Sequence, residues 1–296
     1  MVKDYHKVKW YTNEVYAMRK NSNHLIYGEN RVYMKQEENI IYYENELEDE
    51  FSKAAITPRK IDGHYNYEGG ILRKIGRVFW YHILAKPLAY LFLKIKFRHK
   101  IVNKECLKQA KGSGFFLYGN HTNAIADALI PTMIGHPVGV YVIVHANNVS
   151  MPVLGKITPS LGALPLPDDK VAMKHFNAAL KHTIEKGKCI TIYPEAHIWP
   201  YYTKIRNFKD SSFRYPAQYG TPVFCFTNTY QKRKKGKTPQ IVTYVDGPFY
   251  PDKELSLREQ KQQLHQQVMA SMKKYCQYSN VEMIKYIKKV QRCDVK

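Results

Sequence analysis

The chain has 296 residues, of which 44% are hydrophobic and 24% are charged, a composition that excludes a wholly disordered protein. Its 46 Lys and Arg residues against 25 Asp and Glu give a formal net charge of +21, so the surface attracts polyanions such as anionic lipid, nucleic acid or an acidic carrier protein. The five cysteines include no close pair, which excludes a disulfide framework or a zinc ribbon and favours a reducing compartment.

Residues 1–70 are predicted to be an appended segment of unknown fold, rich in Tyr, Asn, Glu and Lys. The N-terminus begins with polar residues and shows no apolar stretch of the kind that forms the core of a secretion signal. We therefore expect a cytoplasmic protein.

Residues 71–100 are predicted to form basic amphipathic helices that lie on an anionic membrane surface. Apolar and aromatic side chains alternate there with Lys and Arg, and Pro87 predicts a break between two helices. His82, Lys86 and Lys94 interrupt the apolar residues, and each would be costly at the centre of a bilayer. The pattern predicts peripheral attachment at the inner face of the membrane rather than a span.

Residues 101–250 alternate between apolar strands and amphipathic helices, and residues 251–296 are predicted to be a closing helical segment. The runs of apolar residues are too continuous for a sheet with one wet face, so the sequence predicts an α/β fold with a mixed sheet covered by helices on both faces. The predicted strands are residues 115–118, 138–144, 189–193, 223–227 and 241–245, and the predicted helices are 124–133, 170–186 and 255–278.

A candidate catalytic pair follows the first of these strands. His121 lies in a short polar turn, and Asp127 falls near the start of the next helix, where the positive end of the helix dipole favours its ionised form. Six positions along one helix separate two side chains by about 240°, so the two can meet only if His121 lies in the turn. An ionised Asp127 can then hold the imidazole of His121.

A second polar group follows the strand at 189–193, where Glu195 comes directly after Tyr193-Pro194. Polar residues at the ends of two buried strands indicate a single cleft. From this context we expect Glu195 to orient a substrate or the turn. The alternative is that Glu195 is a solvated acid in a loop. His197 is expected to be structural or to replace a cation of the site.

The motifs in residues 71–246 resemble those of the glycerolipid acyltransferase family typified by 1-acylglycerol-3-phosphate acyltransferase. Four motifs occur in the family's order: Asn120-His121 with Asp127, Tyr193-Pro194-Glu195, Phe208-Lys209 with Phe213, and Thr221-Pro222-Val223. The resemblance implies that His121 is the general base, that Asp127 orients it, and that residues 207–214 form a lysine-bearing helix.

Two departures from the family pattern concern the site. Five residues separate His121 from Asp127 instead of the usual four, so a bulged turn or longer loop must restore the contact. The family's phosphate-binding arginines have no counterpart in residues 162–168, and Ile198 replaces another arginine. If the acceptor carries phosphate, Lys204, Arg206 and Lys209 are the expected substitutes.

The sequence therefore predicts transfer of a fatty acyl group from acyl-CoA or acyl carrier protein to the hydroxyl of a lysophospholipid or glycerol-phosphate acceptor. His121 and Asp127 are the predicted catalytic residues, and Asn120, Glu195, His197, Lys204, Arg206 and Lys209 are the predicted substrate-binding residues. We expect no cofactor and no metal. One alternative is a glycolipid or neutral lipid acceptor, and another is a non-enzymatic basic protein that binds lipid or nucleic acid. The basic residues are spread over every segment, so we expect no nucleic-acid partner. The chain has no Gly-x-Ser-x-Gly turn of a serine hydrolase.

Overall fold

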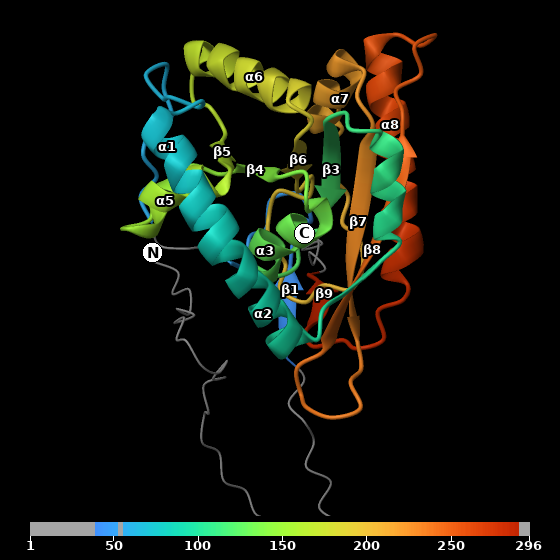
Figure 1. Ribbon diagram of the computed structural model, residues 1–296. Helices are drawn as coiled ribbons and strands as arrows, with labels where there is room; N and C mark the ends of the chain where they lie inside the picture. The colour runs from blue at the N-terminus through green and yellow to red at the C-terminus, as the bar shows by residue number, and fades with distance from the viewer. Residues whose placement is uncertain (1–38, 53–55, 290–296) are drawn as a thin grey trace, which may run out of the picture. The chain divides into compact units, whose positions relative to one another are not determined.

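The computed structural model describes residues 39–52 and 56–289, so the expectations for residues 1–38, 53–55 and 290–296 lie outside the described residues. The centre of the fold is a seven-stranded sheet in the order β2-β8-β7-β3-β6-β4-β5 (Figure 1). Strands β7, β3, β6, β4 and β5 run parallel, and β8 runs antiparallel to β7. The strands are β2 Lys100–Val102, β3 Phe115–Gly119, β4 Val140–Val144, β5 Ala163–Pro165, β6 Cys189–Ile192, β7 Val223–Gln231 and β8 Gln240–Phe249.

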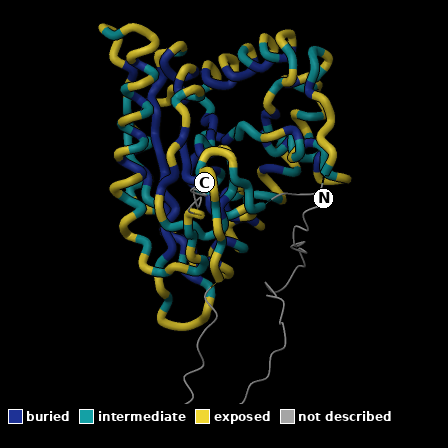
Figure 2. Tube along the Cα trace, turned by 180° about the vertical axis from the view of Figure 1, so that it is seen from behind, coloured by how far each residue is buried: buried dark blue, intermediate teal, exposed yellow. Residues whose placement is uncertain are grey.

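Helices cover both faces of this sheet, and the strands between them are buried (Figure 2). Strand β3 shows why, because its side chains alternate between two apolar clusters: Phe116 packs toward one, and Phe115 and Leu117 toward the other. One cluster includes α6 Lys170–Glu185, α7 Arg214–Tyr219 and α8 Leu257–Cys276, and the other includes α2 Lys86–Phe97 and α3 Ala126–Gly135. The predicted mixed α/β sheet with helices on both faces is confirmed.

The two long predicted helices of the α/β region begin at side chains that cap them. Asp169 accepts a hydrogen bond from the amide of Ala172 at 2.8 Å at the start of α6. Helix α8 begins with a capping box, in which Ser256 and Glu259 each bond to the other's backbone amide. The short elements were not predicted: β2, β5, 3-10 turns at Lys104–Ala110 and Ser211–Phe213, and the helices α4 Asn147–Ser150 and α5 Leu154–Leu161.

Residues 71–97 form one continuous helical rod, composed of α1 Ile71–Gly76, a π-helical stretch Arg77–Ala85 and α2 (Figure 1). The predicted break at Pro87 is wrong. The backbone stays right-handed helical at Gly76, Ala85 and Lys86, and Pro87 lies in the first turn of α2, where a missing amide hydrogen is tolerated. The change from π- to α-helix takes place at this point instead of a break.

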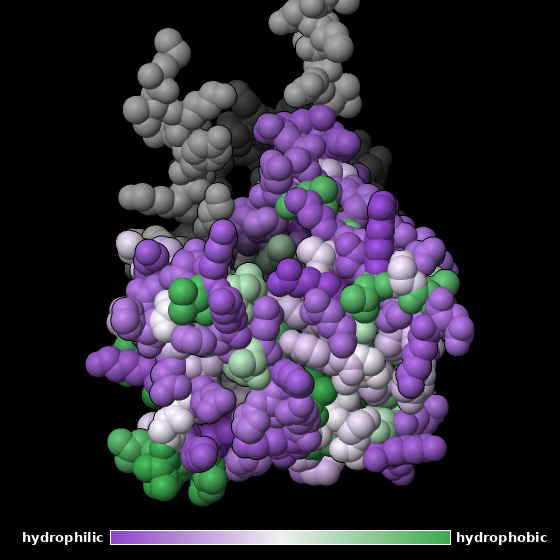
Figure 3. Space-filling view, turned by 90° about the horizontal axis from the view of Figure 1, so that it is seen from above, coloured by the Kyte–Doolittle hydropathy of each residue, from purple (hydrophilic) through white to green (hydrophobic). Residues whose placement is uncertain are grey.

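The rod exposes apolar side chains along its length. The exposed residues are Ile71, Leu72, Ile75, Val78, Phe79, Ile83, Leu84, Leu88, Tyr90, Leu91 and Ile95. Figure 3, a view from above, shows apolar side chains gathered at one edge of a face that is otherwise mostly hydrophilic. Arg77 anchors the rod from the other side, because its guanidinium donates to the carbonyl of Val140 at 3.0 Å and lies over the ring of Tyr141. Among the described residues, no helix is both long and apolar enough to cross a membrane.

Part of the segment before residue 70 packs against the α/β region. Strand β1 Ile40–Tyr43 pairs in parallel with β9 Lys285–Lys288 as a separate two-stranded sheet. Ile61 and Tyr67 are buried in the same apolar cluster as α6. The division of the chain at residue 70 stays a prediction about domains, but the core draws side chains from both sides of it.

Candidate active site

The candidate site begins where β3 ends, at a turn that joins it to α3. Gly119 is the last residue of the strand, and a Cβ atom there would lie 2.1 Å from the ring of Phe226, so only glycine fits. The buried side chain of Asn120 bonds twice to the backbone of Asn228 in β7: its oxygen accepts from the amide at 2.7 Å, and its nitrogen donates to the carbonyl at 3.1 Å. These bonds fix the start of the turn against the neighbouring strand.

The structure brings His121 and Asp127 together, with 2.9 Å between Nδ1 of the imidazole and Oδ2 of the carboxyl group. The same oxygen accepts hydrogen bonds from the amides of Thr122 at 2.7 Å and Asn123 at 2.8 Å. Residues 121–125 form a non-helical turn before α3, so the longer loop that the sequence required is present. An ionised carboxylate only accepts hydrogen bonds, so a neutral imidazole in this contact has its hydrogen on Nδ1 and its free lone pair on Nε2.

Burial differs between the two members of the pair. The side chain of Asp127 is 1% exposed, and that of His121 is 18% exposed, so the carboxylate is enclosed while the imidazole reaches the surface. The imidazole stacks on the ring of Tyr193 with 4.4 Å between the ring centroids and 19° between the planes. The hydroxyl of Tyr193 donates to the carbonyl of Asp127, which ties the end of β6 to the first turn of α3.

Glu195 is buried and acts on the turn through backbone and side-chain bonds. Its carboxyl group accepts from the amide of His121, the amide of Arg206 and the guanidinium of Arg206, each at 3.1 Å. Burial raises the pKa of Glu195, and the positive charge of Arg206 acts against that effect. The alternative of a solvated loop acid is thereby excluded.

Arg206 lies in the interior and not at an open surface. It is fully buried, donates to the carbonyls of His197 and Glu46 as well as to Glu195, and lies over the ring of Trp199 at 4.8 Å. The loop that follows β6 also runs beside the turn that carries His121, since the amide of Trp199 donates to the carbonyl of His121 at 3.2 Å. The loop that follows β6 therefore supports the position of the imidazole.

The remaining predicted site residues lie farther out. His197 pairs with Glu50, with 3.2 Å between Nδ1 and the carboxyl oxygen. Lys204 and Lys209 are exposed on the loop that precedes the 3-10 turn. The expected lysine-bearing helix over residues 207–214 is wrong, because helix α7 begins only at Arg214. Phe213 ends the 3-10 turn that precedes α7, and its ring stacks on that of Tyr118 with 4.2 Å between the ring centroids.

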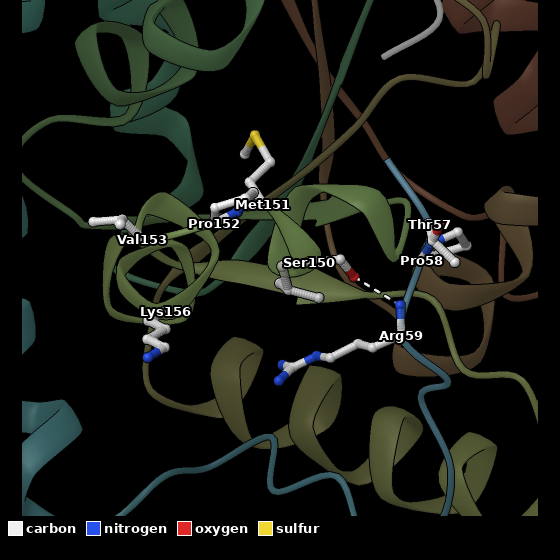
Figure 4. Close-up of a pocket in the computed structure, with 9 residues that line it drawn as sticks. Thr57, Pro58, Arg59, Ser150, Met151, Pro152, Val153 and Lys156 are labelled. Carbon is white, nitrogen blue, oxygen red and sulfur yellow. Dashed lines mark hydrogen bonds between the residues drawn. The ribbon is translucent and has the colours of Figure 1, made fainter. Parts of the chain in front are cut away.

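A cavity of about 500 Å³ is lined by residues 57–59 and by residues of α4, α5 and the segment between them. Figure 4 shows these side chains. The amide of Arg59 donates to the hydroxyl of Ser150 at 2.9 Å at the rim of the cavity. None of the predicted site residues lines it; the lining residues are Thr57, Pro58, Arg59, Val149, Ser150, Met151, Pro152, Val153 and Lys156.

The chain was compared with protein families, curated proteins and solved structures. The model of the family described as Acyltransferase matches residues 98–227, which include His121, Asp127 and Glu195. No curated protein matches the sequence. Among solved structures, the chain is similar to the crystal structure of the 1-acyl-sn-glycerophosphate (LPA) acyltransferase PlsC from Thermotoga maritima. The identity is 17% and the TM-score 0.48, over 71% of this chain and 82% of that chain.

Proposed function

We propose that this enzyme, whose residues 98–227 match the family model described as Acyltransferase, acylates a lipid hydroxyl with His121 as the general base. One observation carries the proposal: Asp127 is enclosed and bonded to Nδ1 of His121, while the imidazole itself is partly exposed. The lone pair on Nε2 is then available to a bound acceptor. The imidazole, held in one tautomer, has the state that a base requires.

The proposed reaction needs no covalent bond to the enzyme. Nε2 of His121 takes the proton of the acceptor hydroxyl as that oxygen attacks the carbonyl carbon of the thioester. The carbon–sulfur bond breaks, and the thiolate takes the proton from the imidazolium, so the products are an ester and a free thiol. A base in this position accelerates the attack by roughly 10²–10⁴. As the donor we propose acyl-CoA or acyl carrier protein.

The other site residues divide into two roles. We assign Asn120, Glu195 and Arg206 to positioning, because each is buried and bonded to the turn or to the loop beside it. The exposed Lys204 and Lys209 remain the proposed contacts of an acidic headgroup. His197, which pairs with Glu50, contributes to the same surface of the loop.

We further propose that the rod at residues 71–97 holds the enzyme on an anionic membrane surface at the inner face of the membrane. Its exposed apolar residues can enter the headgroup and acyl boundary, and its lysines can meet acidic lipids. A lipid acceptor would then reach the site from the same membrane.

The deciding experiment combines an acceptor panel with a catalytic variant. The purified enzyme is given acyl-CoA or acyl carrier protein together with lysophosphatidic acid, another lysophospholipid, glycerol 3-phosphate, monoacylglycerol or a glycolipid, and the ester is identified by mass spectrometry. We expect preference for a phosphate-bearing acceptor and loss of at least about 10³-fold in kcat for His121→Ala. The control is His175→Ala, at an exposed position of α6, which should keep wild-type activity.

Two results would contradict the proposal. Wild-type turnover by His121→Ala would contradict the role of His121 as the base. Preference for monoacylglycerol or a glycolipid would favour the alternative of a neutral acceptor. In the second case, Ala at Lys204 and Lys209 should leave acceptor discrimination unchanged instead of raising KM.

A further inference from the structure

A chain of buried polar side chains leads away from the carboxylate of Asp127 on the side opposite to His121. Oδ1 of Asp127 lies 3.1 Å from Nδ2 of Asn228 in β7, and Oδ1 of Asn228 lies 2.6 Å from the hydroxyl of Thr243 in β8. That hydroxyl lies 2.8 Å from Nε2 of His99, which follows α2. All four residues are buried, the most exposed being His99 at 4%.

The register of the sheet brings together the two middle residues of this row of polar side chains. Asn228 and Thr243 are directly opposite one another in the antiparallel pair β7–β8, so their side chains meet on one face. Both side chains are buried, and a polar amide at position 228 would be costly if it were unpaired. The side-chain oxygen of Asn228 is instead bonded to Thr243 and its side-chain nitrogen to Asp127.

The direction of every hydrogen bond follows from the carboxylate. An ionised Asp127 only accepts, so Asn228 must present its amide nitrogen to it and its amide oxygen to Thr243. The single hydroxyl hydrogen of Thr243 is then used on that oxygen, and the hydroxyl must accept from His99. His99 therefore carries its hydrogen on Nε2.

The environment of His99 agrees with this assignment. Burial, with a smaller contribution from Lys94, lowers the pKa of His99 to about 4, so the imidazole is neutral at ordinary pH. A neutral imidazole donates from one nitrogen only, and the contact with Thr243 places that donor at Nε2. All the donors of the chain thus point toward Asp127.

We propose that Asn228, Thr243 and His99 are positioning residues that fix the carboxylate of Asp127 and, through it, the Nδ1–H tautomer of His121. Oδ2 of Asp127 is held by the turn and Oδ1 by this chain, so the carboxyl group cannot rotate away from the imidazole. The catalytic consequence rests on the proposed function of His121, whereas the structural consequence does not.

The first test removes the hydroxyl in the middle of the chain. Thr243→Val keeps the shape of the side chain but breaks both of its bonds, and we expect kcat to fall about 10-fold with little change in KM, the scale seen when an outer partner of a site residue is lost. The matched control is Thr229→Val in β7, since Thr229 is equally buried and donates to the carbonyl of Val242 at 2.8 Å. The control should lose similar thermal stability and stay within about twofold of the wild-type kcat.

Conservative variants give the rescue. Thr243→Ser retains a hydroxyl and should restore most of the activity. His99→Gln retains an N–H donor near the position of Nε2, and His99→Phe does not, so the first should be more active than the second. A purely structural role would make activity follow thermal stability instead of the presence of a donor.

The second readout does not depend on catalysis. Nitrogen-15 NMR of the imidazole of His121 reports which ring nitrogen carries the hydrogen, and in the wild type it should be Nδ1. In Thr243→Val the population should shift toward the Nε2–H tautomer, and in Thr229→Val it should not. An unchanged tautomer together with wild-type kcat in Thr243→Val would overturn the inference. If the wild type transfers no acyl group, the proposed function fails while the NMR comparison still decides the role of the chain.

Discussion

The site behind His121 and the rod at residues 71–97 depart from the usual distribution of polarity in opposite ways. The first buries charged and polar side chains, including Asp127, Glu195 and Arg206, beneath the surface. The second exposes a row of large apolar side chains, among them Leu72 at 81% exposure. A buried polar group is costly unless it is paired, and a row of exposed apolar groups marks a surface that something covers.

The difference teaches where each region finds its partners. In the buried region, the carboxylates and the guanidinium form hydrogen bonds with other groups of the same protein. The described residues supply no such cover for the apolar side chains of the rod. The site is organised by the chain itself, and the rod needs an external apolar phase, for which we propose the membrane.

The largest effect should come from removing the buried negative charge of Asp127. Asp127→Asn keeps the shape of the side chain but removes the negative charge that orients His121. Because the imidazole itself survives, we expect kcat to fall by roughly 10²–10³, less than in His121→Ala, while the fold is retained. The measurement is steady-state acyl transfer together with thermal unfolding. The control is Asp252→Asn, at an exposed position, which should behave as the wild type. Activity of the Asp127 variant within tenfold of wild type would contradict an orienting role for this carboxylate.

The sequence predicted the elements in which apolar residues recur at a regular spacing and the polar residues that directly follow a buried strand. Helices α6 and α8 were expected within two residues of their ends, because apolar side chains recur along one face of each. The pair His121 and Asp127 was expected because both follow a buried strand. The rod was expected because its apolar and aromatic residues alternate with Lys and Arg along the sequence.

The parts that were missed depend on distant or irregular contacts. Asn228 reaches Asp127 only through the alignment of β3, β7 and β8, which no local pattern records. The ion pair of Glu195 and Arg206 joins positions in an irregular loop. Strand β1 pairs with β9 across almost the whole sequence. The one signal that sequence reasoning could have used was Asn228, an amide side chain within the predominantly apolar and Thr-containing run of β7.

A smaller effect should follow from changing the apolar face of the rod. Replacing both Leu72 and Leu88 by Glu removes two exposed apolar groups, each worth about 1.5 kcal/mol or more when buried in lipid, so partition into anionic vesicles should fall about 100-fold. Sedimentation with vesicles measures it, and kcat on a dispersed acceptor should remain. The matched control is Leu257→Glu, at an exposed leucine of α8. High salt should release part of the wild-type protein, because its lysines are screened. Undiminished partition of the double variant would rule out this face as the membrane contact.

The smallest expected effect concerns His99, at the end of the row of buried polar side chains, and is a change in how the free energy of unfolding depends on pH. The folded state holds the pKa of His99 at about 4, mainly because of burial, whereas an unfolded chain has the ordinary value of 6.5. Between these values the unfolded state binds a proton that the folded state does not, so the free energy of unfolding falls as the pH is lowered and levels off below about pH 4. Between pH 6 and pH 5 the contribution of this one group is about 1 kcal/mol. Denaturant unfolding of His99→Gln should lack that contribution, and the same substitution at the exposed His175 should retain it. His82 in the rod, whose pKa is also lowered by desolvation and by neighbouring cations, should contribute a residual slope that remains in His99→Gln. A slope as steep as that of the wild type in His99→Gln would show that His99 does not contribute.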